Sequence, residues 1–202
     1  MVKAGERSPD PVPKRADARR NISLILDAAT TCLAADPDVS VTDIAAAAGV
    51  GRITVYGHFA SRAELVDAVL SRVIEQADAV LAQTDTTGNP RDALARLVGS
   101  SWQIVDQFRN ILQAAQRELP AERIRGVHDR VLRRAQSVIE RGQRAGEFRR
   151  DLPKSWLVTT TFTLMHAAAG DVAAGRVKPD DASRLIAATV LAAFTPPGGT
   201  VQ

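Results

Sequence analysis

The sequence predicts an all-α protein, and three observations point the same way. Apolar residues make up 45% of the 202 residues, and along most of the chain they recur at spacings of three and four, the period of an amphipathic helix. Aromatic residues are only 4% of the chain while alanine and leucine are common, a composition that favours helices. No segment shows the pattern of a strand.

The chain is expected to begin with a disordered arm over residues 1–14, since three prolines stand among polar residues there. A helical period begins near Ala16. It stops at Asp36-Pro37-Asp38, because proline ends a helix.

Two very short helices joined by a glycine turn are predicted next. Ser40 has the place of an N-cap, with an acidic residue three positions later, and opens a helix from Val41 to Ala48. Gly49 suits a left-handed C-cap, Val50-Gly51 forms a turn, and a third helix runs from Arg52 to Phe59. These are the elements of a helix-turn-helix, whose second helix lies in the major groove of DNA. Similar pairs also occur in ordinary helical bundles, so spacing alone leaves DNA binding open.

The rest of the chain is predicted to be helical as well. Ser61 caps a long fourth helix that begins near Arg62, and the polar segment 83–90 ends it. The further helices are expected at 91–116, in a short piece from Pro120, and at 127–141, 153–175 and 180–194. This pattern divides the chain into an arm at 1–14, a helix-turn-helix domain at 15–62 and a second helical domain at 63–202.

Composition excludes several other classes of protein. Cys32 is the only cysteine, so an intramolecular disulfide and a cysteine-rich metal site are excluded, and Cys32 is either a packed small side chain or a reactive thiol. No metal or cofactor is expected. The chain has no run of 18 apolar residues and no apolar segment of a secretion signal near its start, so we expect a cytoplasmic protein without a membrane span.

Charge does not identify the partner. The formal net charge is +3. Residues 1–62 carry eight basic and seven acidic side chains, whereas residues 117–151 carry ten arginines and six acidic side chains. The basic excess therefore lies away from the helix-turn-helix, and the arginine-rich segment is interpreted most simply as a solvated, ion-paired face.

One set of residues resembles a known family. The pattern Ser40-Val41-x-x-Ile44-Ala45-x-x-Ala48-Gly49-Val50, followed by Thr54-x-Tyr56-x-His58-Phe59 and Leu65, is similar to the DNA-binding signature of the tetracycline-repressor (TetR) family. The likeness spans about residues 15–70, and the segment from Gly146 to Pro153 resembles a feature of that family's second domain. It implies a DNA-binding domain at the N-terminus and a divergent helical domain that binds a ligand and dimerises.

The resemblance also implies roles for individual residues. Arg52 is expected to read a guanine edge with two hydrogen bonds, and Ile53 to touch a thymine methyl group. Contacts to phosphates or positions in the groove are implied for Arg15, Arg19, Arg20, Ser40, Thr42, Thr54, Tyr56, His58 and Arg62. Two positions depart from the family pattern, because Gly51 replaces a serine of this DNA-binding set and Gly57 replaces a larger residue within the reading helix.

The second domain is expected to enclose a pocket for a small apolar or amphipathic effector. Its candidate lining residues, which are otherwise ordinary core residues, are Trp102, Val105, Phe108, His128, Leu132, Thr159, Met165 and His166. The helices at 153–175 and 180–194 are expected to form a homodimer interface. Two-fold symmetry then places the two reading helices about 34–36 Å apart on a near-palindromic double-stranded operator. The effector is expected to release the protein from DNA.

Two other functions remain open at this point. A small helical enzyme would need titratable groups gathered at one cavity, and the sequence shows no such motif; His58 has no nucleophile beside it. A dimeric helical sensor or interaction protein with weak or lost DNA binding is consistent with Gly51 and Gly57. The expected function is a transcriptional repressor, with an activator left open as an alternative.

Overall fold

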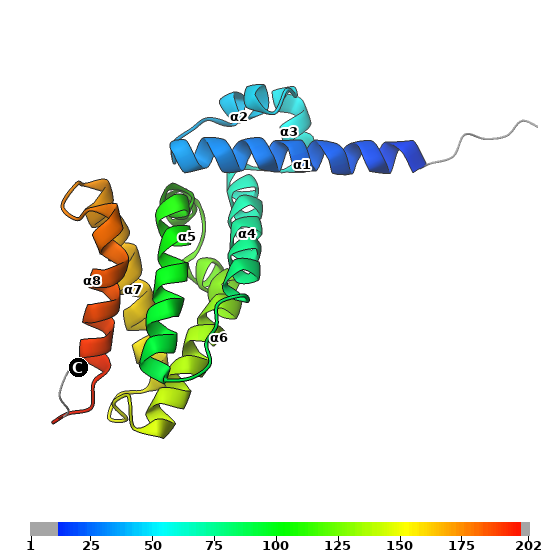
Figure 1. The fold of residues 1–202 in the computed structure, drawn as a ribbon. Coiled ribbons are helices and arrows are strands. Elements are labelled where there is room, and N and C mark those ends of the chain that lie inside the picture. Colours follow the sequence, from blue (N-terminus) through cyan, green and yellow to red (C-terminus); the bar gives the residue numbers. More distant parts are fainter. Residues whose placement is uncertain (1–11, 199–202) are drawn as a thin grey trace, which may run out of the picture.

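The computed structural model describes residues 12–198, and over that range the chain consists of helices without a strand (Figure 1). The helices are α1 (Val12–Ala35), α2 (Val41–Ala47), α3 (Arg52–His58), α4 (Arg62–Leu81), α5 (Pro90–Glu118), α6 (Ala121–Ala145), α7 (Lys154–Ala173) and α8 (Pro179–Phe194). The predicted all-α class is confirmed. None of the helices between residues 12 and 198 combines the length and apolar character that a bilayer crossing needs.

Two of the predicted boundaries are wrong. α1 begins at Val12, so residues 12–14 of the predicted arm are helical, while residues 1–11 lie outside the described part. Proline is compatible with this start because Pro13 stands in the first turn, where a missing N–H breaks no helical hydrogen bond. α6 is one continuous helix instead of a short piece followed by 127–141, and Gly126 within it is exposed and does not interrupt it.

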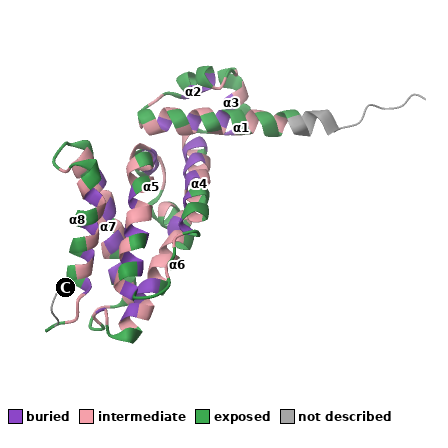
Figure 2. Cartoon of the chain, viewed as in Figure 1, coloured by how far each residue is buried: buried purple, intermediate pink, exposed green. Residues whose placement is uncertain are grey.

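The N-terminal core lies between α1, α2, α3 and the first half of α4. Its buried side chains include Ile25 and Leu33 from α1, Ile44 from α2 and Val55 from α3. Figure 1 shows α2 and α3 lying along one side of α1, and Figure 2 shows that their outward surfaces are largely exposed. The short helices are therefore held by α1 and α4 and leave one side free.

The helix α4 belongs to both halves of the molecule. Its residues from Leu65 to Val73 pack into the N-terminal core, whereas Leu81 packs into the second core. The last turns of α5 also reach the N-terminal core through Ile111 and Ala115. A boundary after residue 62 therefore marks the start of α4 and does not separate two independent packing units.

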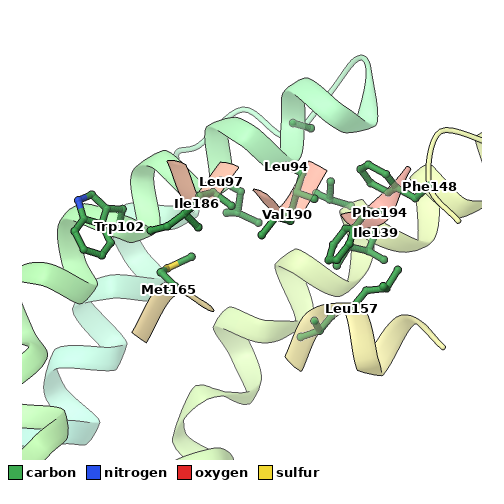
Figure 3. Packing of buried hydrophobic residues seen from close by; sticks show 14 of the residues in the cluster. Leu94, Leu97, Trp102, Ile139, Phe148, Leu157, Met165, Ile186, Val190 and Phe194 are labelled. Atoms are coloured by element: carbon green, nitrogen blue, oxygen red, sulfur yellow. The ribbon is translucent and has the colours of Figure 1, made fainter. Parts of the chain in front are cut away.

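The second core is formed by α5, α6, α7 and α8 (Figure 3). Phe148 and Phe194 meet edge to face, with ring centroids 5.9 Å apart, and both are fully buried. The Phe148 ring lies directly against Gly142, where a Cβ atom would come within 2.1 Å of Cδ2. Gly142 is thus required for this close approach, and it fixes the end of α6 against the segment that leads to α7.

Candidate nucleic-acid interface and ligand cavity

Local hydrogen bonds fix the two short helices. The Ser40 hydroxyl accepts a hydrogen bond from the Asp43 backbone N–H at 3.1 Å and donates one to the Asp43 carboxylate at 2.6 Å. This confirms Ser40 as the N-cap of α2. Its hydroxyl hydrogen is donated to Asp43 and is therefore already used within the protein. Gly49 has a φ of 68°, the left-handed conformation that lets the chain turn sharply after α2.

The helix α3 has one packed face and one free face. Val55 is buried in the N-terminal core, as is Phe59 directly after the helix. On the other face Arg52, Ile53 and Tyr56 are exposed, and Ile53 has 89% of its surface accessible. The guanidinium carbon of Arg52 lies 5.4 Å from the centre of the Tyr56 ring, a cation–π contact that restrains the arginine.

The remaining predicted DNA contacts lie on the same domain with different degrees of exposure. Arg19 in α1 and Thr42 in the first turn of α2 are exposed, while Thr54 and His58 are half-buried on α3. Gly51 is exposed directly before α3 and offers no side-chain cap to it. The side chain of Arg15 lies outside the described part of the structure.

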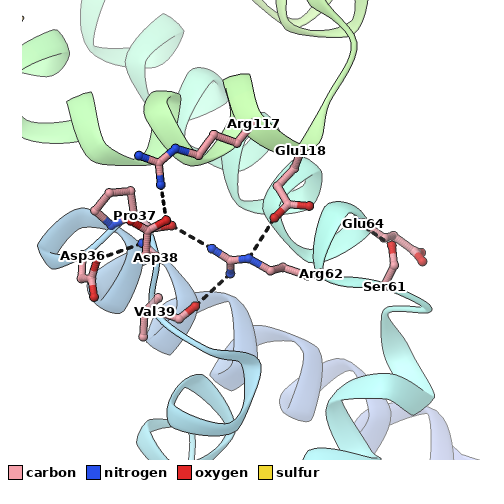
Figure 4. Close-up of polar contacts among 9 residues, drawn as sticks. All are labelled: Asp36, Pro37, Asp38, Val39, Ser61, Arg62, Glu64, Arg117 and Glu118. Atoms are coloured by element: carbon pink, nitrogen blue, oxygen red, sulfur yellow. Dashed lines mark hydrogen bonds and ion pairs between the residues drawn. The ribbon is translucent and has the colours of Figure 1, made fainter.

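Arg62, for which a phosphate contact is predicted, makes its hydrogen bonds inside the protein. Its guanidinium donates to the carbonyl oxygens of Pro37 and Val39 at 2.7 and 2.9 Å, and to the Glu118 carboxylate at 3.0 Å (Figure 4). All three nitrogens are therefore engaged within the protein. The guanidinium joins the turn between α1 and α2 to the end of α5, so Arg62 connects the two halves of the molecule, and its contact to phosphate stays a prediction.

Two further side chains of α5 reach the last residues of α1 and the turn after it. The Asn110 amide donates to the carbonyl oxygen of Ala34 at 2.8 Å, and Arg117 forms an ion pair with Asp38. Sequence analysis missed this junction, which we define as Asp38, Arg62, Asn110, Arg117 and Glu118. Its contacts join residues that are between 23 and 79 positions apart in the chain, so no local spacing reveals them.

A cavity of about 100 Å³ lies among α4, α5, α6 and α7. The predicted residues that border it are Val105, Phe108, His128, Leu132, Met165 and His166. Two of the predicted residues do not border it. Trp102 is buried in the second core instead of bordering the cavity (Figure 3), and Thr159 is exposed on α7.

Sequence analysis also missed part of the cavity wall. The α4 residues Leu70, Val73 and Ala77 border it, as does Thr161 on α7. Phe108, which was predicted, borders the cavity at the point where its φ and ψ of −110° and 17° interrupt α5. The apolar stripe of α4 was evident in the sequence, but only the fold shows that it faces this cavity.

The two cavity histidines are neutral at pH 7. Burial lowers the pKa of His128, and burial together with the neighbouring His128 lowers the pKa of His166 to about 4. His128 Nδ1 lies 2.7 Å from the Ile124 carbonyl oxygen. Among residues 12–198, no group of three or more His, Cys, Asp or Glu side chains is arranged to hold a metal ion. Cys32 is half-buried beside the N-terminal core.

Known proteins resemble this chain in both sequence and fold. Residues 25–69 match the family of bacterial regulatory proteins named tetR. The HTH-type transcriptional repressor LfrR of Mycolicibacterium smegmatis is 43% identical over 77 residues, which span 38% of this chain and 41% of LfrR. That match therefore covers less than half of LfrR.

Solved structures extend the likeness over most of the chain. The structure of LfrR from Mycobacterium smegmatis in complex with proflavine has a TM-score of 0.65 and 26% identity, covering 90% of this chain and 98% of LfrR. The fatty acid degradation regulator FadR from Bacillus halodurans has a TM-score of 0.72, covering 92% and 97%, but at 18% identity it shows the fold alone.

The matched residues include most of those that form the N-terminal core. They run from the middle of α1 through α2 and α3 into α4, and the fold behind them is shared over nearly its whole length. Residues 25–69 therefore match the tetR family of bacterial regulatory proteins, and the fold of the whole chain is similar to that of the solved tetR-like regulator LfrR.

Proposed function

We propose that this chain is a transcriptional repressor that binds a near-palindromic operator as a homodimer and is released by a small molecule. The free face of α3 carries this proposal. Arg52, Ile53 and Tyr56 stand exposed on a short helix whose opposite side is packed into the N-terminal core. An α-helix fits the major groove, where Arg52 can donate two hydrogen bonds to one guanine.

Contacts to the DNA backbone would come from the helices beside α3. Arg19 on α1 supplies a positive charge, and Thr42 on α2 supplies an exposed hydroxyl near the start of that helix. Such contacts set the position of the protein without reading sequence. Arg62 is left out of this set because its nitrogens are bonded inside the protein.

The exposed faces of α7 and α8 support the homodimer. On α7 the exposed stripe contains Trp156, Thr159, Thr163 and Ala167, which carry no charge, and Trp156 is 58% exposed. The exposed side of α8 includes Leu185, which is 41% exposed, together with small residues of its last turns. Both helices lie at one edge of the molecule in Figure 1, where a second copy can cover them.

The cavity supports release by an effector. One of its walls is α4, the same helix that packs into the N-terminal core. A ligand that binds the released form more tightly than the DNA-bound form would lower operator affinity. The structure of LfrR with proflavine, which has the same fold, is consistent with a small-molecule ligand in this chain.

Fluorescence anisotropy on the DNA upstream of the chain's own gene tests the proposal. We expect sequence-specific binding that weakens steeply with salt, because phosphate contacts release counterions. Arg52→Ala should cost about 1–3 kcal/mol at the cognate site and relax the preference at one base pair. The matched control Arg125→Ala removes an exposed arginine from α6 and should leave the specificity unchanged.

Other outcomes would assign a different function. A dimer that binds no upstream sequence more tightly than random DNA would favour the sensor or interaction protein that Gly51 and Gly57 allow. Specific binding that increases transcription in a reporter assay would show an activator instead of a repressor.

A further inference from the structure

We propose that the cavity binds an uncharged, mainly apolar ligand of the phenol class, and that His128 and His166 recognise its hydroxyl group. This inference rests on the proposed function only in treating the cavity as the effector site. It concerns the chemistry of the ligand, which the operator experiments do not address.

The lining of the cavity argues against a charged ligand. None of the residues that border it is Asp, Glu, Lys or Arg. The nearby carboxylate of Asp78 faces a separate surface groove and is paired with Arg134 at 2.9 Å. A charge buried without a partner is strongly disfavoured, so an ammonium or carboxylate ligand would find nothing in the wall to balance it.

Few polar groups in the wall are free to recognise a ligand. The polar lining residues are Ser101, His128, Thr161 and His166. The Thr161 hydroxyl donates to the Leu157 carbonyl oxygen at 3.0 Å within its own helix, so its hydrogen is already used.

The protonation state of His128 follows from its hydrogen bond. A carbonyl oxygen only accepts, so the 2.7 Å contact with Ile124 places the hydrogen on Nδ1 and leaves Nε2 as an acceptor. His166 makes no side-chain hydrogen bond with the described residues, and its neutral ring offers one donor and one acceptor. A ligand hydroxyl both donates and accepts, and it therefore matches this pair of rings.

The surrounding rings favour an aromatic ligand. Phe162 meets His166 edge to face with centroids 4.2 Å apart, and it meets His128 at 5.2 Å. Phe108 borders the cavity from α5. Aromatic rings pack well in such edge-to-face surroundings. The volume of about 100 Å³ is below the roughly 150 Å³ of an apolar cavity that takes benzene, so even one ring would press on the walls.

Calorimetric titration of the full chain at pH 7 tests the inference with four compounds that share one ring. These are 4-ethylphenol, ethylbenzene, 4-ethylbenzoate and 4-ethylbenzylammonium. We expect 4-ethylphenol to bind about threefold to tenfold more tightly than ethylbenzene, the usual net effect of one hydrogen bond. Both ions should bind at least about tenfold more weakly than the phenol.

Variants assign the hydroxyl recognition to the histidines. In His166→Phe the preference for the phenol over ethylbenzene should disappear, whereas His166→Gln keeps a hydrogen-bonding group and should retain part of it. The control Gln103→Ala changes an exposed side chain of α5 that does not border the cavity, and should leave the preference unchanged. Circular dichroism of each variant establishes that it is folded.

Three results would overturn the inference. They are equal binding of an ion and the phenol, equal binding of ethylbenzene and the phenol, and no binding of the phenol up to its solubility limit. Because the titration contains no DNA, any of these would leave operator binding untouched. A failure of operator binding would likewise leave the ligand preference standing.

Discussion

The junction between the two halves of the molecule makes a quantitative prediction for Arg62→Ala. The substitution removes two charge-assisted hydrogen bonds to backbone carbonyl oxygens and one ion pair with Glu118. The Arg62 side chain is 25% exposed, so water compensates part of the loss, and we assign about 1–1.5 kcal/mol to each carbonyl contact. The ion pair with Glu118, which is partly exposed, adds about 0.5 kcal/mol to this loss. The free energy of unfolding should therefore fall by about 3 kcal/mol.

Thermal and urea unfolding monitored by circular dichroism measure this loss. For a chain of this size, about 3 kcal/mol corresponds to a decrease in Tm of about 6–12 °C. Glu118→Gln should cost only about 0.5 kcal/mol, since it leaves both carbonyl contacts in place. Arg176→Ala is the control, because its pair with Asp171 is exposed and should be worth less than about 0.5 kcal/mol.

The same variant separates the two roles considered for Arg62. If Arg62 is only an internal connector, its substitution should leave the salt dependence of operator binding unchanged. If Arg62 contacts a phosphate, its substitution should reduce the slope of log affinity against log salt by about 1. A stability loss below about 1 kcal/mol together with a reduced slope would refute the connector role.

Three further predictions concern single positions. Gly142→Ala should lower the free energy of unfolding by about 1–2 kcal/mol, measured by urea unfolding. The added Cβ would overlap the Phe148 ring, and the cost of this overlap exceeds the gain from the higher helix propensity of alanine. Gly57→Ala should raise the free energy of unfolding by about 0.5–1 kcal/mol, since a Cβ there meets no atom within 4 Å in the described structure. Between pH 6.5 and 4 the free energy of unfolding should fall by about 3 kcal/mol more in the wild type than in His166→Phe. His166 has a pKa of about 4 in the folded protein, so over this range it takes up its proton more readily in the unfolded state.

Each of these predictions has a result that would contradict it. Unchanged stability of Gly142→Ala would mean that the Phe148 ring does not lie against the helix in solution. A less stable Gly57→Ala would show that this glycine is needed within the protein itself. Parallel pH profiles of wild type and His166→Phe would show that His166 is solvated. Stability lost as the pH rises would contradict the sign of its pKa change.

Helix caps and helix faces were the features best predicted from the sequence, because they depend on residues close together in the chain. Ser40 and Gly49 were identified as helix caps because a cap needs only a few adjacent positions, and both have that role in the structure. The faces of α3 were also evident, since Val55 and Phe59 fall on one side at helical spacing. The packed and exposed faces of α3 were therefore predictable before any coordinates, whereas its role in reading DNA stays a prediction.

Contacts between distant segments were not predictable in this way. The role of Arg62 depends on carbonyl groups and on Glu118, which no local pattern associates with it. Thr159 was misplaced because α7 has small or apolar residues on every face, so periodicity gives no direction. Trp102 was misplaced because Val98 and Val105, which lie four and three residues from it on the same side of α5, both border the cavity, so helical spacing does not separate Trp102 from them.

Hydroxyl-radical footprinting of the wild type on the upstream DNA tests most directly whether two copies of α3 read one operator. We expect two protected patches, related by two-fold symmetry and centred about 10 base pairs apart, that vanish together in Arg52→Ala. A single patch, or protection that the Arg52 substitution leaves intact, would contradict this expectation.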